Sequence, residues 1–305
     1  MKILIIGCGI QGLKYLEVFK AFRISVVGIC VKNRYKNRSY LIKNYRISKI
    51  YFNIKESLTN SEYDAVFVFL PWYSIEKLIP DIIKYSKANI FTEKPIALST
   101  KKINKIVNLS TKYKKKVYVL YNRRYYSNIL HLKKLIKKKQ ILNFNGTIFE
   151  NKTKFESKNS KKLHSKYKYF MTSHWIDLLM FLFNKIKFEV KKLDANSKVI
   201  LIKGQNLNGT LTLVNKINDT LKLNFYGKNG KIYKFDTLEK MIKSSNLRKV
   251  KETLTFKKQK IIIEENKYKP GLYNLIHYFI KNPKNPKYLP KVNDLAKLYK
   301  ILKLV

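Results

Sequence analysis

Cysteine and long apolar runs are both scarce in this sequence of 305 residues. Cys8 and Cys30 are the only cysteines, which speaks against a disulfide framework and makes a reducing cytoplasm the expected location. No apolar run approaches the roughly 18 residues that a membrane-spanning helix needs. The opening "MKILIIGCGI" superficially resembles a lipoprotein signal, but its apolar core is too short for one. We therefore expect a globular cytoplasmic protein with no targeting segment and no membrane span.

Acidic residues are also few, since 19 Asp and Glu stand against 65 Lys and Arg and leave a formal charge of +46. Such a surface attracts phosphate without any sequence code. The lysines are spread over nearly every segment, however, and arginine, which suits bidentate contacts with bases and phosphates, is infrequent. Arginine occurs at positions 23, 34, 38, 46, 123, 124 and 248. Abundant Lys, Ile, Asn and Tyr are typical of coding by an AT-rich genome, so we expect nonspecific nucleic-acid association at low salt and no specific nucleic-acid partner.

Alternating strand and helix patterns fill the first 121 residues. Short apolar runs predict strands, and the stretches between them predict helices, the first over Gln11–Phe22. The predicted strands are 2–6, 24–31, 48–52, 64–70, 89–93 and 116–121. Alternation of this kind is typical of parallel strands joined by crossover helices. We therefore predict an α/β fold whose first domain, residues 1–121, is a doubly wound parallel sheet of the Rossmann type.

Closely spaced strand patterns without helices between them dominate the second half of the chain. They follow a helix predicted over 127–139, a polar loop over Asn151–Lys168 and a helix over Thr172–Phe183. The predicted strands are 198–204, 209–214, 220–227, 230–235 and 260–265, and two helices near Gly271–Lys281 and Val292–Leu302 close the chain. Such close spacing favours an antiparallel sheet. We predict a second, α+β domain over residues 122–305, built on an open, mostly antiparallel sheet.

Glycine is rare, with 10 residues in the chain, yet three of them form the pattern GCGIQG at residues 7–12. The pattern lies where the first predicted strand turns into the first helix. There, GxGxxG lets the backbone approach a pyrophosphate while the helix N-terminus faces its charge. A glycine turn with only a structural role is the alternative. We predict a dinucleotide site at Gly7, Gly9, Ile10, Gln11 and Gly12.

No acidic residue ends the second predicted strand, where an acid about 20 positions after the glycines would bond the ribose hydroxyls of NAD. The strand ends in Val31 and is followed by Lys32, Asn33 and Arg34. Cations at this position suit the additional phosphate of NADP(H), which we favour over NAD(H). The alternative is that Lys32 and Arg34 only reflect the lysine-rich surface.

The stretch YFMTSHWIDLLMFLF, residues 169–183, carries His174 and Asp177 at the head of an apolar helix. Thr172 or Ser173 would serve as its N-cap, and residues three apart share one helix face. That face can therefore hold a site that contains both polar side chains. The alternative is a partly buried histidine bonded to the backbone and a solvated aspartate.

Three further segments carry a family resemblance. TEKPIALS, with Glu93-Lys94-Pro95 after the fifth predicted strand, follows the N-terminal GxGxxG, and YNRRYY and SHWIDLL come after it in order. Over most of the chain the sequence resembles the Gfo/Idh/MocA oxidoreductases, the glucose-fructose oxidoreductase and inositol dehydrogenase family. The resemblance implies a Rossmann domain followed by an α/β domain whose open sheet commonly mediates homodimers or homotetramers. It also implies NAD(P)-dependent hydride transfer at a CH-OH group, usually of a sugar, sugar nucleotide or cyclitol, and short bacterial members suggest surface polysaccharide biosynthesis as the context.

The resemblance also implies roles for the residues that match family motifs. Lys94 would bridge nicotinamide and substrate, His174 would exchange the hydroxyl proton, and Asp177 would lie near the substrate hydroxyls. Alcohol oxidation does require a base for the proton and a cation beside the developing alkoxide. The remaining positions that the resemblance implies are Leu70, Pro71, Glu93, Lys94 and Asn122 at the cofactor and Arg123 and Tyr169 at the substrate. No metal site is expected.

One position departs from the family pattern. Four residues before the histidine, many members carry an aspartate that works with the lysine and histidine, whereas this chain has Phe170. Tyr167, Tyr169 or His164 could supply a substitute polar group. Two hypotheses follow: a catalytic oxidoreductase, and a non-catalytic sensor or regulatory protein of the same fold that binds a dinucleotide or a sugar nucleotide.

The adjacent Arg123 and Arg124 also have two interpretations. They could pair with a phosphate or carboxylate of a sugar nucleotide or sugar acid. Alternatively, they form a structural pair that faces solvent or the other domain.

Overall fold

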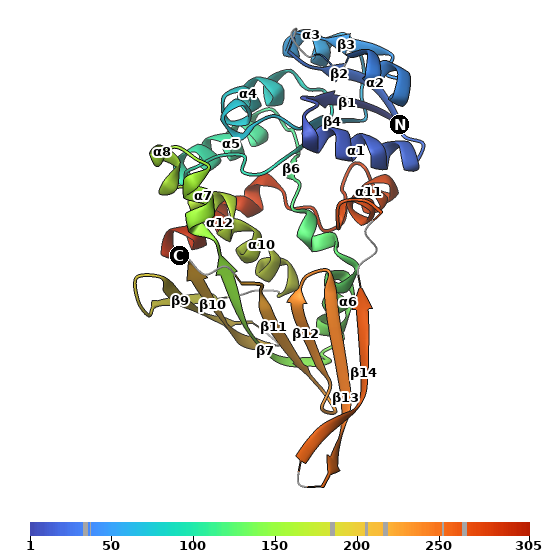
Figure 1. Ribbon diagram of the computed structural model, residues 1–305. Helices are drawn as coiled ribbons and strands as arrows, with labels where there is room; N and C mark the ends of the chain where they lie inside the picture. Colours follow the sequence, from blue (N-terminus) through green and yellow to red (C-terminus); the bar gives the residue numbers. More distant parts are fainter. Residues whose placement is uncertain are drawn as a thin grey trace. The chain divides into compact units, whose positions relative to one another are not determined.

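The computed structural model describes all residues except 33–35, 37, 184–186, 205–206, 216–218, 252 and 264–266, and it leaves out the side chains of 246–248, 254, 257 and 258. The chain folds into two compact units (Figure 1). The first comprises Met1–Asn122 and Lys267–Lys300, and the second comprises Arg123–Asn266 and Ile301–Val305.

A six-stranded parallel sheet forms the centre of the first unit. Its strands are β1 (Lys2–Ile6), β2 (Ser25–Cys30), β3 (Lys49–Tyr51), β4 (Ala65–Val68), β5 (Asn89–Thr92) and β6 (Val117–Val119). They lie in the order β3-β2-β1-β4-β5-β6, and every neighbouring pair is parallel. This order confirms the predicted doubly wound sheet. It reverses between β1 and β4, so the crevice beyond the carboxyl ends of these strands is where such a fold binds ligands.

Helices connect these strands and pack against the sheet. They are α1 (Ile10–Ala21), α2 (Arg38–Tyr45), α3 (Ile54–Thr59), α4 (Trp72–Tyr85) and α5 (Thr100–Lys112). Side-chain caps start two of them: Asn53 accepts from the Glu56 N–H, and Ser99 accepts from the Lys102 N–H. A cap of this kind pairs one of the backbone donors that a helix start leaves without an intrahelical partner.

The C-terminal segment Lys267–Lys300 also belongs to the first unit. It contains α11 (Leu272–Lys281) and most of α12 (Val292–Leu304). The ring of Phe279 on α11 lies 5.2 Å from that of Phe67 and 5.0 Å from that of Phe91. The sequence predicts a second domain that is contiguous from residue 122 to residue 305. The structure differs because burial of the apolar face of α11 returns this segment to the parallel sheet.

An eight-stranded sheet forms the second unit. Its strands are β7 (Ile141–Glu150), β8 (Lys187–Lys192), β9 (Ser197–Lys203), β10 (Asn208–Asn215), β11 (Lys222–Gly227), β12 (Ile232–Thr237), β13 (Lys240–Val250) and β14 (Thr253–Ile263). Their order is β14-β13-β12-β11-β7-β10-β9-β8. All neighbours are antiparallel except β7 and β10. The prediction of a mostly antiparallel sheet is confirmed, although β7, β8 and β13 were not among the predicted strands.

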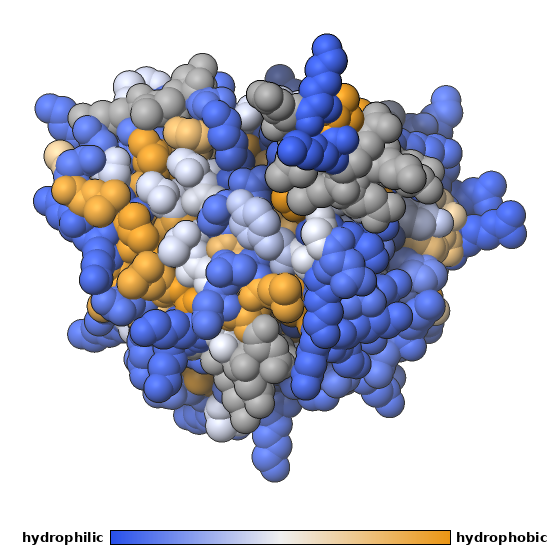
Figure 2. Space-filling model, turned by 90° about the horizontal axis from the view of Figure 1, so that it is seen from below, coloured by the Kyte–Doolittle hydropathy of each residue, from blue (hydrophilic) through white to orange (hydrophobic). Residues whose placement is uncertain are grey.

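One face of this sheet is buried, and the other is mixed in polarity. The buried face includes Phe144, Leu211 and Phe225, and the ring of Phe144 stacks on that of Phe183 at 4.9 Å. Along each strand these residues alternate with partly exposed ones such as Val214 and Tyr226. Figure 2 shows a face of the molecule on which apolar side chains lie among hydrophilic ones.

Short helices lead from the sheet to the predicted histidine helix. The second unit begins within the 3-10 helix η1 (Asn122–Tyr125), whose first residue belongs to the first unit, and continues with α6 (Ser127–Lys137). After β7 it contains α7 (Lys152–Ser157), α8 (Lys161–His164), α9 (Tyr167–Phe170) and α10 (Thr172–Leu182). The prediction of a polar loop over Asn151–Lys168 is therefore wrong in part. Local capping explains the difference, because the Asn151 side chain accepts from the Lys154 N–H at 2.8 Å and starts α7.

The predicted N-cap of α10 is also wrong, because Met171 occupies that position and makes no side-chain cap. The Thr172 hydroxyl instead donates to Glu150 at 2.8 Å, and the Ser173 hydroxyl donates to the Tyr169 carbonyl at 2.8 Å. Over the described part of the chain, no helix has the length and apolar character required to cross a membrane.

Candidate active site

Gly7, directly after β1, occupies a position that only glycine can fill. Its φ is +84°, in the left-handed region that side chains disfavour. A Cβ atom at this position would lie 2.7 Å from Leu70 Cδ2 and 2.8 Å from the Phe69 carbonyl oxygen. The Gly7 N–H donates to the Cys30 carbonyl at 2.8 Å. The loop is thus held against the carboxyl ends of β2 and β4.

Gly9 and Gly12 are required for different reasons. Gly9 is the N-cap residue of α1, and apart from its chain neighbours no atom of the described residues would lie within 4 Å of a Cβ atom there. A Cβ atom at Gly12 would lie 3.0 Å from the Gly7 carbonyl oxygen. Gly12 therefore lets α1 pack closely on the loop, whereas no contact with the described residues gives a reason for a glycine at position 9. Open space at a helix N-terminus fits the approach of a pyrophosphate.

The other predicted cofactor residues surround the same edge of the parallel sheet. Leu70 and Pro71 follow β4, where Pro71 is the N-cap residue of α4. Glu93 and Lys94 follow β5, and the Lys94 N–H donates to Glu93 Oε2 at 3.4 Å. The Asn122 amide donates to the Pro270 carbonyl at 3.0 Å. The structure thus places these residues beyond the carboxyl ends of strands in the first unit.

Lys269 joins this edge of the sheet and was not predicted. Its ammonium group donates to Gln11 Oε1 at 2.9 Å across 258 residues of sequence. Burial raises the pKa of Glu93, and the charges of Lys269 and Lys94 oppose that shift. Two cations and one carboxylate therefore lie near the glycine loop. No local sequence signal could identify Lys269, because only the return of the C-terminal segment brings it here.

The cation cluster predicted to select NADP(H) is described only in part. Lys32 follows β2 and is exposed to solvent. A residue that binds a ligand phosphate at the surface must be exposed in this way. Asn33 and Arg34 lie outside the described residues. Their role stays a prediction.

In the second unit, Arg124 and Asp177 form a buried ion pair. Arg124 Nε donates to Asp177 Oδ2 at 2.8 Å, and Arg124 Nη2 donates to Oδ1 at 2.5 Å. Asp177 is 1% exposed, so the alternative of a solvated aspartate is wrong. Both oxygens already accept from a guanidinium in the bidentate geometry that suits the pair. A contact between Asp177 and substrate hydroxyls stays a prediction.

Arg123 lies against the first turn of the same helix. Its guanidinium carbon is 3.9 Å from the centroid of the Trp175 ring, a distance typical of a stacked cation–π contact. Burial lowers the pKa of Arg123, and the charges of acidic neighbours that include Glu150 oppose that shift. Arg124 is thus paired with Asp177, whereas Arg123 lies near the charges of Glu150, Glu239 and Asp177.

Glu150, the last residue of β7, is the main site residue that the sequence did not reveal. It is 4% exposed, and its Oε2 accepts the Thr172 hydroxyl proton at 2.8 Å. Burial raises the pKa of Glu150 to about 7, while the Thr172 hydrogen bond and the charges of Arg123 and Lys198 oppose the shift. Tyr167 lies near enough that the Glu150 charge contributes to its raised pKa, after the larger effect of burial.

The remaining predicted residues lie on or beside the start of α10. His174 is partly exposed, whereas Tyr169 is 6% exposed and burial raises its pKa. The ring of Phe170 lies 5.3 Å from that of Phe155. His164 Nε2 lies 3.0 Å from the Glu156 carbonyl and 2.9 Å from the Asn159 carbonyl. Since carbonyls only accept, this nitrogen carries a proton and is directed at the local backbone.

The family comparison agrees with the geometry of the first unit. Residues 1–121 match the Gfo/Idh/MocA family model, which describes an oxidoreductase family with an NAD-binding Rossmann fold. This part of the chain is similar to the Rossmann domain of the Gfo/Idh/MocA oxidoreductases. The resemblance predicted from the sequence is thereby confirmed. No curated protein sequence matches the chain.

Solved structures resemble nearly the whole chain, including the part beyond the residues that match the family model. A dehydrogenase from Chromobacterium violaceum has a TM-score of 0.75 at 13% identity, covering 99% of this chain and 93% of that one. An NAD-binding oxidoreductase from Klebsiella pneumoniae has a TM-score of 0.75 at 12% identity, covering 100% and 96%. A UDP-N-acetylglucosamine 3-dehydrogenase from Acidithiobacillus ferrooxidans has a TM-score of 0.71 at 12% identity, covering 100% and 96%. At these identities, the similarity establishes the fold.

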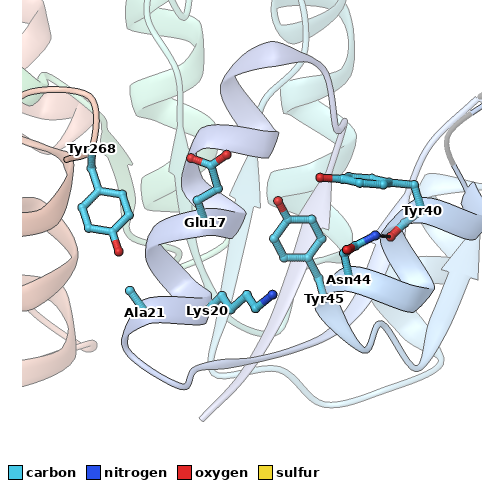
Figure 3. A pocket seen from close by; sticks show the side chains of 7 residues that line it. All are labelled: Glu17, Lys20, Ala21, Tyr40, Asn44, Tyr45 and Tyr268. Carbon is cyan, nitrogen blue, oxygen red and sulfur yellow. Dashed lines mark hydrogen bonds between the residues drawn. The ribbon is translucent and has the colours of Figure 1, made fainter. Parts of the chain in front are cut away.

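A separate hollow in the first unit has a volume of about 390 Å³ (Figure 3). Its lining residues are Glu17, Lys20, Ala21, Tyr40, Asn44, Tyr45 and Tyr268. Glu17, Lys20 and Ala21 lie toward the C-terminal end of α1, whereas the glycine loop lies at its N-terminus. With a helical rise of about 1.5 Å per residue, the two features are separate. Within the described residues, no group of three or more His, Cys, Asp or Glu could hold a metal ion.

Proposed function

We propose that this protein is an NAD(P)-dependent oxidoreductase that transfers a hydride between a nicotinamide and a hydroxyl or keto carbon of a sugar, sugar nucleotide or cyclitol. The glycine loop is the observation that carries the proposal. Gly9 leaves open space at the N-terminus of α1, although no contact with the part of the chain that the structure describes requires a glycine there. The family description supports NAD binding. The printed name of one structural neighbour, a UDP-N-acetylglucosamine 3-dehydrogenase, supports a sugar-related substrate.

Each residue of the proposed site has a chemical task. Gly7, Gly9 and Gly12 would admit the pyrophosphate, and the positive end of the α1 dipole would face its charge. A bound nicotinamide would supply the hydride chemistry. The Lys94 ammonium would stabilise negative charge on the substrate oxygen, and the His174 ring would take or return the hydroxyl proton. Because Phe170 replaces the usual aspartate, we expect Lys94 and His174 to carry the proton chemistry.

For the cofactor, we propose a preference for NADP(H) over NAD(H). The exposed Lys32 would bind the 2′-phosphate together with Arg34. The family description itself names NAD.

Assembly and context extend the same proposal. We propose that the mixed open face of the eight-stranded sheet pairs two copies of the chain into a homodimer, or four into a homotetramer. A cytoplasmic location and a role in surface polysaccharide biosynthesis stay predictions.

A non-catalytic sensor of the same fold is the second candidate. Two observations favour it: Phe170 removes one usual catalytic carboxylate, and Arg124 occupies both oxygens of Asp177. Such a protein would bind a dinucleotide and a sugar ligand without turnover.

Turnover and binding measurements separate the two candidates. Purified protein would be incubated with NADPH or NADH and a panel of keto-sugars, and with NADP⁺ or NAD⁺ and the matching alcohols. Cofactor oxidation or reduction with at least one substrate supports the enzyme. Binding of cofactor and sugar without turnover supports the sensor, and failure to bind either cofactor contradicts both.

A further inference from the structure

The hollow at the C-terminal end of α1 takes no part in the proposed reaction (Figure 3). Its volume is about 390 Å³, and sites for small ligands commonly measure about 300–1,000 Å³. Three of the seven lining residues are tyrosines: Tyr40 and Tyr45 from α2, and Tyr268 from the segment before α11. Figure 3 shows Tyr268 on one side of Glu17 and Lys20, and the other two tyrosines on the opposite side. Aromatic rings therefore frame a space that is large enough for a small ligand.

Neighbouring side chains hold these tyrosines in place. The rings of Tyr40 and Tyr45 meet edge to face at 6.0 Å. Burial, and after it a hydrogen bond with Tyr40, raises the pKa of Tyr45. The Lys20 ammonium lies 5.7 Å from the centroid of the Tyr45 ring, within cation–π distance. Tyr268 stacks on Tyr273 at 5.8 Å. Side chains that are already ordered lose little entropy when a ligand stacks on them.

The aromatic rings continue beyond the hollow. Tyr273 lies against Phe22 with their ring centroids 4.5 Å apart. We call these two residues and the three tyrosines of the hollow the aromatic surface. Tyr40 is 50% exposed and Tyr273 is 48% exposed. Large apolar side chains that gather at a surface mark sites of interaction, whereas scattered single ones need no explanation.

The charge of the surrounding segments is almost entirely positive. Residues 14–23, 38–46 and 267–273 supply the lining of the hollow, and Glu17 is the one acidic residue in their sequence. Their eight cationic residues are Lys14, Lys20, Arg23, Arg38, Lys43, Arg46, Lys267 and Lys269. Positive charge attracts phosphate groups. It repels an ammonium ligand, which tyrosines and a single carboxylate would otherwise suit.

Two properties define the ligand that fits this surface: flat faces for the rings and negative charge for the cations. Bases on a phosphate backbone offer both, and stacking on aromatic side chains tolerates every base. In a duplex, neighbouring bases cover these faces, so only an unpaired strand can use the tyrosines. An acidic peptide would satisfy the cations and leave the rings without a stacking partner.

We propose that the aromatic surface binds single-stranded nucleic acid without sequence preference, with one base in the hollow between Tyr268 and the pair of Tyr40 and Tyr45. The phosphates on either side of that base lie against the cations of the same segments. This binding differs from the general attraction of phosphate to a chain with a formal charge of +46, because it requires the bases as well. It is independent of the proposed oxidoreductase chemistry, since the glycine loop lies at the other end of α1.

Fluorescence anisotropy with labelled oligonucleotides tests the proposal on the wild-type protein. The ligands would be a single strand of about 12 nucleotides, the same backbone without bases, and the matching duplex, at about 0.15 M salt. We expect the single strand to bind at least about 10-fold more tightly than the abasic strand and the duplex. Equal affinity for the abasic strand would show that only phosphates are bound and would overturn the proposal. A preference for the duplex, or no binding of the single strand at this salt, would also overturn it.

Two variants and a matched control locate the binding. Tyr40→Leu and Tyr268→Leu remove a stacking face and keep an apolar side chain, so each should weaken the single strand about 5-fold or more and leave the abasic strand unchanged. Tyr73→Leu is the control, because Tyr73 is 58% exposed on α4 and does not line the hollow. Thermal melting checks the fold of all three. Wild-type affinity in both folded hollow variants, or an equal loss in the control, would place the strand elsewhere and contradict the proposal.

Two further measurements exclude other ligands of this surface. Saturating NADPH should leave the affinity for the single strand unchanged, and full displacement by NADPH would place the strand at the glycine loop and overturn the proposal. Glu17→Gln removes the one acidic residue of the lining and should tighten the single strand, because a carboxylate repels phosphate. If Glu17→Gln instead leaves the strand unaffected and abolishes binding of tetramethylammonium, the hollow is a cation site and the proposal is wrong.

Discussion

Replacing Gly9 by valine should abolish dinucleotide binding while leaving the protein folded. Among the described residues, a Cβ atom at Gly9 would have no neighbour within 4 Å beyond the adjoining residues, and φ is −79°, which any residue can adopt. The cost to the protein is therefore limited to the helix cap, where valine is poorer than glycine by about 1 kcal/mol. For a domain of this size, such a loss lowers the melting temperature by about 2–4 °C.

The effect on the cofactor should be far larger. A valine side chain would fill the space that the pyrophosphate needs at the N-terminus of α1. We expect NADPH and NADH affinity to fall at least 100-fold, which corresponds to about 2.8 kcal/mol or more. Fluorescence titration with both cofactors measures this loss, and circular dichroism with thermal melting checks the fold.

Gly7→Val is the matched contrast within the same loop. Its φ of +84° and the 2.7 Å approach of Leu70 Cδ2 predict loss of stability as well as loss of binding. A folded Gly9→Val protein with wild-type affinity for both cofactors would refute the placement of the dinucleotide. Unfolding of Gly9→Val would refute the claim that the space beside Gly9 is open.

Three more expectations concern charge. Replacing Lys32 and Arg34 by alanine should weaken NADPH binding by about 1–3 kcal/mol and NADH binding far less. Equal losses of affinity for both cofactors in titrations would show that the pair only contributes general positive charge. Arg124→Ala should lower the free energy of unfolding by about 3–5 kcal/mol, because Asp177 stays buried without its partner. In urea unfolding, the double variant with Asp177→Asn should recover part of this loss, and no recovery would contradict the ion-pair argument. Burial raises the pKa of Glu150 to about 7 despite the nearby cations Arg123 and Lys198, so ionisation of this carboxyl group destabilises the folded protein. The free energy of unfolding should therefore fall by up to about 3 kcal/mol between pH 5 and pH 8. Glu150→Gln should remove that part of the fall, and an unchanged pH profile in this variant would contradict the assignment.

The parallel sheet was predictable because its strands are buried on both faces. Continuous apolar runs such as 2–6 and 65–68 follow from that burial, and glycines at residues 7–12 identify the edge that carries the site. Strand β7 was not predicted because one face of its sheet is open. Asn143, Asn145 and Gly146 interrupt its apolar pattern, and Gly146 is small because a Cβ atom there would lie 2.3 Å from Leu223 Cδ2 on β11.

The contacts that complete the site depend on tertiary structure. Lys269 reaches Gln11 across 258 residues, and Glu150 reaches Thr172 across 22. Sequence spacing identified His174 and Asp177 as neighbours on one helix face. It could not show that Asp177 is paired with Arg124, because that contact depends on how η1 packs against α10.

Hydride transfer by the wild-type protein and by three variants tests the central claim most directly. The absorbance of NADPH would be followed with the keto-sugar panel, and any substrate found would be assayed with Lys94→Ala, His174→Ala and the double variant. We expect each single change to cut turnover about 100-fold or more with cofactor affinity largely intact. The double variant should lose less than the two effects combined, because both residues act on one oxygen in one step. Full activity of His174→Ala would contradict the proton path, and a wild type that binds NADPH and a sugar but turns over nothing would contradict the enzyme itself.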